Sequence, residues 1–413
     1  MDNREIIRKF FGLGSASAIN IAVLTLMSLL VAKFLTVESF GITRSITAYM
    51  VVLVMLGHFT FHDALASFVS REQRDEDRNK YFASATWLVV VNSSLLSLIS
   101  YILIKYTGLW SGNLQSSFAI AVLFLPFAAL AITYNSALQA IGEYRGLMIV
   151  TILTAVIPFC LILPLSYNYE LIGWVSGRVV SFVLLTLVSS YFVFRYLRAL
   201  KFNVRAFKKL FSFARVQIFS GVLSLVLLSA DIIMLERLTD DISDVAYYGL
   251  AAFFAKSLMF IPSVFGRLYF KQIADFSIGI TTKNKIVEFL FVVSIVCLIL
   301  SIVIYFIGPI VIDYIYGESY SQSSDILKIM AYGIVFMGLW HAISTVNIAT
   351  NKPARSLYVS ATGSIAALVL MWFLIPEYGG VGAAWSMVVA NLIGVCVGVM
   401  AIINDCLSRI GKC

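Results

Sequence analysis

The sequence predicts an all-α, polytopic membrane protein with about 12 transmembrane helices, arranged as two parallel six-helix halves around a central cavity. Three observations predict this fold class: the hydropathy of the chain, the distribution of its basic residues, and a repeat at about half its length. Of the 413 residues, 60% are hydrophobic and 13% are charged, and the mean hydropathy is +0.93. A water-soluble domain has roughly a quarter of its residues charged, so this much apolar surface requires lipid as its solvent.

Twelve apolar runs are long enough to cross a bilayer, which takes about 20 residues of helix. The predicted spans are residues 11–33, 41–62, 82–104, 117–138, 147–166, 171–194, 212–235, 246–266, 286–312, 326–349, 356–375 and 381–403. Helix is the expected form, because lipid cannot satisfy open backbone groups and the runs lack the alternation of barrel strands. The first run is longer than a signal-peptide core, so we expect it to be a retained span.

Basic residues predict which way the spans face. If both termini and every second connection share one side, that side holds 23 of the 30 Lys and Arg residues, whereas the opposite loops hold three. By the positive-inside rule both termini are cytoplasmic. This placement accounts for the net charge of +8 without a nucleic-acid partner. The longest basic connection, Arg195 to Arg215, is interpreted as a cytoplasmic linker, and an amphipathic helix on anionic lipid is compatible with it.

The sequence repeats itself at an offset of about 208 residues. Ile172-Gly173 falls near Val381-Gly382, and Phe40-Gly41 falls on Tyr248-Gly249. The end of the fourth span, residues 138–140, falls on residues 346–348 at the same offset. We therefore expect two halves, residues 1–200 and 201–413. Six spans is an even number, so the halves enter the membrane from the same side as parallel repeats.

Motifs of enzymes and cofactor sites are missing from the sequence. There is no GxxxxGK[ST], HExxH or GxSxG, and the five cysteines form no CxxC pair. His58 and His62 lie one helical turn apart without a visible third ligand, so we interpret them as interface histidines rather than a metal site. The protein is expected to be no enzyme and to need no cofactor, with proton or sodium coupling left open.

Several segments resemble the polysaccharide flippase (Wzx-type) branch of the multidrug/oligosaccharidyl-lipid/polysaccharide exporter superfamily. They are ADIIMLERL with VAYYGLAAFFAKS, IYGESY followed by DILKIM, and IPEYGGVGAAWSMVVANLIG. The resemblance implies a transporter of the bacterial inner membrane that flips a polyprenyl-pyrophosphate-linked oligosaccharide to the outer leaflet by alternating access. Its implied partners are that lipid-linked oligosaccharide, membrane lipids and other proteins of surface polysaccharide (O-antigen) assembly.

Charged residues inside spans are costly and mark candidate functional sites. Four basic residues lie within predicted spans: Arg44, Arg178, Lys256 and Lys328. A cavity lined by these side chains suits an anion such as pyrophosphate. For Arg44 and Lys328 the alternative is that they snorkel to the surface, and Lys328 can also pair with Asp325.

Polar residues within the spans are candidates for contacts with sugar, and one acid is a candidate for ion coupling. The sugar candidates are Asn135, Gln139, Asn347 and Trp340, together with Asn20 and Tyr134. Asp231 is the candidate ion-coupling site, and its alternative role is an internal ion pair with Lys256.

Three other readings stay open. A multidrug or cation exporter of the same superfamily should favour acids in its cavity, whereas here basic residues outnumber acids in the spans. A membrane glycosyltransferase or polysaccharide polymerase usually has a sizeable outer loop, and every predicted outer loop has about fifteen residues or fewer. The lipid II flippase branch usually has more than twelve spans.

Overall fold

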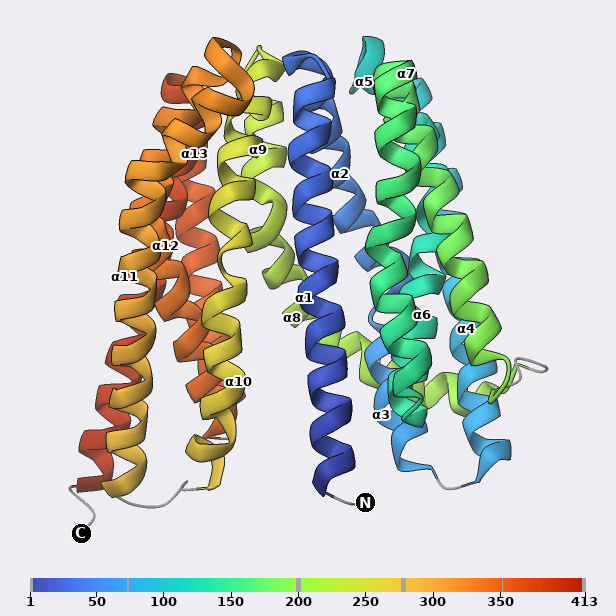
Figure 1. Ribbon diagram of the computed structural model, residues 1–413. Helices are drawn as coiled ribbons and strands as arrows, with labels where there is room; N and C mark the ends of the chain where they lie inside the picture. Colours follow the sequence, from blue (N-terminus) through green and yellow to red (C-terminus); the bar gives the residue numbers. More distant parts are fainter. Residues whose placement is uncertain (1–2, 73, 198–201, 276–279, 351, 411–413) are drawn as a thin grey trace. The chain divides into compact units, whose positions relative to one another are not determined.

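The computed structural model describes residues 3–72, 74–197, 202–275, 280–350 and 352–410, and within these ranges it contains helices and no strands (Figure 1). Eight stretches of the described residues are long and apolar enough to cross a membrane. Three of them, Tyr144–Val193, Asn284–Ala349 and Arg355–Ile403, have 49 to 66 residues and each contains more than one helix. The all-helical membrane fold is thus confirmed, and the number twelve stays a prediction.

The chain forms two compact units, Met1–Val222 and Leu223–Cys413. The helices of unit 1 are α1 (Asn3–Phe34), α2 (Val37–His58), α3 (Phe61–Arg71), α4 (Asp75–Tyr106), α5 (Gly112–Ala121), η1 (Val122–Phe124), α6 (Leu125–Ile141), α7 (Tyr144–Val193) and the first part of α8 (Val204–Leu238). Helix α1 lies along α7, α6 packs against α7, and α3 and α4 pack against α6.

Unit 2 begins within α8. Its other helices are α9 (Ile242–Ser257), α10 (Phe260–Asp275), α11 (Ile280–Tyr316), η2 (Gly317–Tyr320), α12 (Ser321–Ala349) and α13 (Pro353–Ile410). Helix α12 is the central element of this unit, because α9, α10, α11 and α13 all pack against it.

Helices α7 and α13 each consist of two helices joined by a sharp reversal. In α7 the reversal is at Glu170, with φ 47° and ψ −128°, and in α13 it is at Gly379, with φ 52° and ψ −129°. These two residues lie 209 positions apart and have almost the same backbone conformation. The reversals separate the predicted spans 147–166 and 171–194, and likewise 356–375 and 381–403. The offset read from the sequence therefore corresponds to a repeated turn in space.

Each reversal is followed, three residues later, by a glycine where two helices meet. A Cβ atom on Gly173 would overlap the backbone carbonyl of Leu165, and a Cβ atom on Gly382 would overlap that of Leu374. Both pairs of residues are again related by an offset of 209. Only glycine lets the second helix of each pair approach its partner's backbone this closely.

Three of the predicted spans are interrupted, although the sequence predicts them as continuous helices. The span predicted at 117–138 contains the 3-10 turn η1 between α5 and α6. The span predicted at 41–62 breaks at Phe59 and Thr60, whose φ angles are 45° and 54°. The Thr60 amide donates to Nδ1 of His58 at 3.2 Å, and its hydroxyl donates to the Ala214 carbonyl at 3.2 Å. The first bond occupies a backbone donor that the break leaves without a helical partner, and the second ties the break to α8.

The span predicted at 246–266 is interrupted as well, between α9 and α10 at Leu258 and Met259. Within the described residues, spans two and eight are therefore both broken helices. In membrane transporters, interrupted helices at corresponding places in two repeats often lie beside a binding site.

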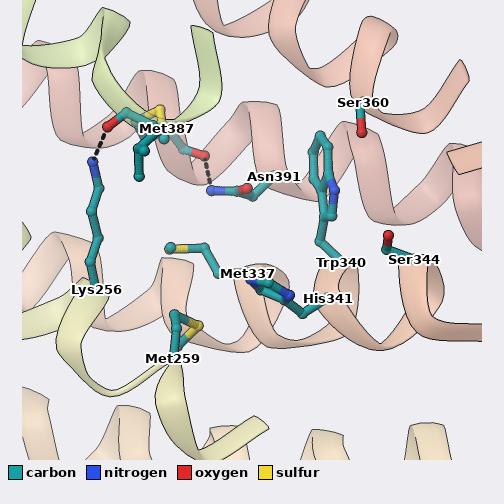
Figure 2. A pocket seen from close by; sticks show the side chains of 10 residues that line it. Lys256, Met259, Met337, Trp340, His341, Ser344, Ser360, Met387 and Asn391 are labelled. Carbon is teal, nitrogen blue, oxygen red and sulfur yellow. Dashed lines mark hydrogen bonds between the residues drawn. The ribbon is translucent and has the colours of Figure 1, made fainter. Parts of the chain in front are cut away.

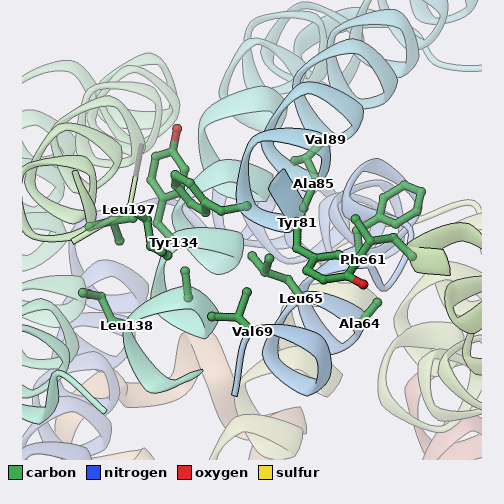
Figure 3. Packing of buried hydrophobic residues seen from close by; sticks show 14 of the residues in the cluster. Phe61, Ala64, Leu65, Val69, Tyr81, Ala85, Val89, Tyr134, Leu138 and Leu197 are labelled. Carbon is green, nitrogen blue, oxygen red and sulfur yellow. The ribbon is translucent and has the colours of Figure 1, made fainter. Parts of the chain in front are cut away.

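The first turns of α8 are amphipathic. Ala206, Leu210 and Ala214 are buried in an apolar cluster with α3, α4, α6 and the end of α7. Figure 3 shows residues of this cluster from α3, α4 and α6. Phe202 and Phe211 are exposed, beside exposed basic side chains at 205, 208 and 209. Within the predicted basic connection, this part thus packs as a helix with one apolar face on the protein.

We predict that Gly173→Ala and Gly382→Ala each lower the melting temperature of the purified protein. The added methyl group must displace a helix backbone, and such overpacking costs about 1–3 kcal/mol. Thermal unfolding followed by thiol-reactive fluorescence in detergent measures the effect. Gly14→Ala is the matched control, because nothing lies within 4 Å of a Cβ at Gly14. Melting temperatures equal to wild type for both variants would contradict the close approach.

Candidate functional site

A cavity of about 190 Å³ lies within unit 1, among α1, α6 and both halves of α7. Two of the predicted site residues, Arg178 and Asn135, line it. Arg178 comes from the second half of α7, directly after the close approach at Gly173, so the repeated turn determines its position. The rest of the lining is mostly apolar, as is usual for sites that bind small groups.

Arg178 is held by aromatic rings rather than by an acid. Its guanidinium carbon lies 5.3 Å from the ring centroid of Trp174 and 6.0 Å from that of Phe182. Its buried Nε atom has no hydrogen-bond partner among the residues that the structure describes. Ring faces stabilise a cation but leave its N–H groups unsatisfied, so this side chain is suited to accept an anion.

Arg44 is a second cation that affects Arg178. Arg44 is half-buried on α2, with its guanidinium carbon 5.9 Å from the ring centroid of Phe40. The positive charge of Arg44 repels the positive charge of Arg178. Two like charges in a low-dielectric environment repel, and a bound anion would relieve both.

The polar residues predicted in unit 1 have different positions. Asn135 accepts a hydrogen bond from the Ser189 hydroxyl at 3.4 Å and lines the cavity. Asn20 donates to the Thr151 carbonyl and the Thr154 hydroxyl, both at 2.6 Å, and so ties α1 to α7.

The other two polar candidates of unit 1 lie outside the residues that line the cavity. Tyr134 is buried in the apolar cluster of Figure 3, where it packs against Phe82. Gln139 is exposed near the end of α6.

A larger cavity, of about 360 Å³, lies within unit 2 (Figure 2). It is lined from α8, the α9–α10 break, α12 and both halves of α13. Trp340 and Lys256 are the predicted site residues there. The lining also includes His341, Asn391 and three methionines, which sequence reasoning did not select. Their signal was weak, because methionine and histidine at helical spacing occur equally often as ordinary packing residues.

Lys256 is neutralised within unit 2. Its Nζ atom lies 2.6 Å from Oδ2 of Asp231, and it also donates to the Leu228 carbonyl at 3.2 Å. Asp231 is completely buried and accepts two further hydrogen bonds, from the Tyr248 hydroxyl at 2.7 Å and from the Ile232 amide at 2.9 Å. The internal ion pair that the sequence left as an alternative is thus present. Its donors satisfy the buried carboxylate, as a charge in a helix bundle requires.

Two predicted residues of unit 2 lie outside the lining of the described cavities. Lys328 is partly exposed and pairs with Asp325 at 2.9 Å, which was the alternative that the sequence left open for that residue. Asn347 is 1% exposed, and neither atom of its side-chain amide has a hydrogen-bond partner in the described part of the chain.

These features define a multi-pass helical membrane protein with a duplicated architecture, in which each unit encloses a cavity beside intramembrane charge. The chain belongs to the polysaccharide biosynthesis protein family, whose sequence profile matches residues 6–268. The resemblance to the polysaccharide branch inferred from the sequence is thereby confirmed.

Two curated relatives match over most of their length. A Shigella flexneri protein named "Putative O-antigen transporter" is 24% identical over 378 residues, which is 86% of this chain and 88% of the relative. The capsular polysaccharide biosynthesis protein CapF of Staphylococcus aureus is 22% identical over 333 residues, which is 76% of this chain and 81% of the relative.

Solved structures show the same fold at low sequence identity. The lipid II flippase MurJ in an inward closed conformation matches with a TM-score of 0.76 and 15% identity, over 94% of this chain and 87% of the other. An inward-facing multidrug resistance transporter of the MATE family matches with a TM-score of 0.72 and 15% identity, over 94% and 96%. Flippases and drug exporters thus share this fold, so the fold does not choose between them.

We predict strong coupling between Asp231 and Lys256. Asp231→Ala leaves a partly buried ammonium without its carboxylate, and breaking such a buried pair costs roughly 3–5 kcal/mol. The double variant Asp231→Ala/Lys256→Met should lose much less stability than the sum of the single variants. Chemical denaturation gives the free energy of unfolding of the wild type, the two single variants and the double variant, which together form a double-mutant cycle.

The control is the exposed pair Asp325 and Lys328, for which the same cycle should give about 0–1 kcal/mol. Additive losses at Asp231 and Lys256 would show that the 2.6 Å contact contributes nothing to stability.

Proposed function

We propose that this protein is a transporter that flips a polyprenyl-pyrophosphate-linked oligosaccharide across the bacterial inner membrane, from the cytoplasmic to the outer leaflet. Transport proceeds by alternating access and involves no covalent chemistry. The family match and the shared fold of flippases support the transporter class, and the chemistry of the unit 1 cavity supports the kind of substrate.

The observation that carries the proposal is the environment of Arg178. A guanidinium beside a cavity, with an unsatisfied buried donor and with Arg44 as its charged neighbour, favours an anionic ligand. Pyrophosphate supplies oxygens that accept from arginine in a planar, bidentate geometry. The binding energy of the anion would offset the cost of keeping Arg178 inside the bundle.

The main rival is a multidrug or cation exporter of the same fold. A cationic substrate needs a carboxylate in its cavity, and the charge that lines the unit 1 cavity is positive. The carboxylate of Asp231 in unit 2 is already bound to Lys256. These two observations favour an anion over a cation as the transported group.

Ion coupling through Asp231 belongs to the same proposal as a secondary step. Three donors already satisfy this carboxylate, so a proton or a sodium ion would bind there only as Lys256 moves away. A coupling role therefore predicts that transport in Lys256→Met vesicles loses its dependence on the ion gradient.

We predict that Arg178→Ala lowers export of the surface polysaccharide at least tenfold and makes the lipid-linked precursor accumulate on the inner leaflet. Losing a charge-assisted contact to phosphate costs about 1.5–3 kcal/mol, which corresponds to roughly 10- to 150-fold. Arg178→Lys should recover part of the activity, because it restores charge but not the planar fork. Surface glycan and leaflet-resolved precursor are measured at matched protein levels.

The matched control is Arg145→Ala, which removes an exposed arginine at the start of α7. It should export like wild type. Normal export by Arg178→Ala would remove the anion-binding role. Normal export after depletion of the protein in a strain without a second carrier would remove the flippase function itself.

A further inference from the structure

The two cavities occupy equivalent places in the repeat. At an offset of 209, six residues that line the unit 1 cavity fall on residues that line the unit 2 cavity. The six in unit 1 are Ala128, Ala131, Ile132, Asn135, Arg178 and Phe182. The same offset relates Glu170 to Gly379 and Gly173 to Gly382. The cavities therefore occupy equivalent positions of the repeat, one within each unit.

The side chains at these equivalent positions have different chemistry. Arg178 in unit 1 corresponds to Met387 in unit 2, so the cation is replaced by a neutral, apolar side chain. Ala131 corresponds to Trp340, which adds an indole. The unit 2 cavity is also the larger, at about 360 Å³ against 190 Å³. The unit 2 cavity thus has no counterpart of Arg178, and it has an aromatic surface and more room.

The indole of Trp340 is clamped by the two halves of α13. A Cβ atom on Gly363 or on Gly394 would overlap its six-membered ring. These glycines permit a bulky ring where the unit 1 copy has alanine. A side chain locked in this way has little conformational entropy left to lose when a ligand stacks on it.

Neutral hydrogen-bonding groups surround the indole (Figure 2). Asn391 donates to the Met387 carbonyl at 2.7 Å, and its side-chain oxygen accepts no bond from the residues described. Ser344 and Ser360 line the same cavity, and Lys256, which also lines it, is bound to Asp231. The available groups are therefore an amide, hydroxyls, the imidazole of His341 and an aromatic face.

This combination fits a sugar ring. A pyranose has an apolar C–H face that stacks on indole and hydroxyls on its edge that bond to amide and hydroxyl groups. A cavity of this volume is within the range of small-ligand sites, about 300–1,000 Å³. The methionines also suit an isoprenoid chain, but a chain of that kind would leave the side-chain oxygen of Asn391 without a partner.

We propose that the unit 2 cavity is a glycosyl subsite that binds a sugar ring of the transported glycan by stacking on Trp340, whereas the unit 1 cavity binds phosphate. The proposal rests on the proposed function and adds a division of labour between the copies. It assigns the phosphate of the substrate to unit 1 and a sugar ring to unit 2.

Two probes test this division on the full-length protein in nanodiscs. One is the phosphate-free oligosaccharide released from the surface polysaccharide of the host strain, and the other is undecaprenyl pyrophosphate without sugar. Binding of each is measured by calorimetry. Trp340→Ala should weaken oligosaccharide binding about tenfold and leave the pyrophosphate unchanged within twofold. Arg178→Ala should show the reverse pattern.

The matched control is Trp385→Ala, which removes an exposed tryptophan of α13 from outside the cavity and should change neither probe. Trp340→Phe preserves most of the packing volume and guards against misfolding. In wild type the oligosaccharide should change the tryptophan fluorescence, and this change should be absent from Trp340→Phe and present in Trp385→Phe.

The outcomes separate this inference from the proposed function. If wild type binds the pyrophosphate but not the oligosaccharide, the glycosyl subsite is wrong and the flippase function stands. If Trp340→Ala weakens the pyrophosphate lipid and not the oligosaccharide, the cavity holds the isoprenoid chain and the inference is overturned. If wild type binds neither probe, both proposals fail.

Discussion

A charge buried in a helix bundle that lipid surrounds has no water to solvate it, and the arrangement of both units reflects this constraint. In unit 2 the constraint is met within the protein, because Lys256, Tyr248 and the Ile232 amide all donate to Asp231. In unit 1 it is met only in part. Aromatic rings cover Arg178, its Nε atom has no partner among the described residues, and its charged neighbour is Arg44. Removing one partner of a buried ion pair leaves an uncompensated charge, whereas a cation with an unpaired donor is a candidate site for a ligand.

The duplication explains why two such different environments occupy the same place in the fold. The reversals at Glu170 and Gly379 have almost identical dihedral angles, and the glycine three residues later permits the close approach in both copies. These backbone features are strict because an added methyl group would meet a carbonyl. Cavity side chains are under no such restriction, and one copy has an arginine where the other has a methionine. A duplicated transporter can in this way recognise two chemical parts of one substrate.

Interrupted helices contribute to the same arrangement. At the break at Phe59 and Thr60, Thr60 forms hydrogen bonds with His58 and with α8, within unit 1. The break between α9 and α10 places Met259 beside the unit 2 cavity. Non-helical backbone at membrane depth is tolerated where protein groups satisfy it or where it lines a cavity. Both breaks meet one of these conditions. Hydropathy predicted continuous spans there because an apolar run does not reveal where its helix breaks.

The sequence by itself determined the helical membrane fold, the offset of the repeat, the family, and which residues carry charge inside the spans. These follow from properties that are local or additive along the chain, such as hydropathy, residue identity and self-similarity. The tertiary structure decided which of those residues share a cavity. The sequence predicts both Lys256 and Lys328 as intramembrane cations. In the structure Lys256 pairs with the buried Asp231, 25 residues away, whereas Lys328 pairs with its exposed neighbour Asp325. Tyr134 and Trp340 both read as candidates for sugar contacts, yet one belongs to an apolar cluster and the other to a cavity. These outcomes depend on helix rotation and on contacts between distant segments, which the periodicity of a single apolar helix does not specify.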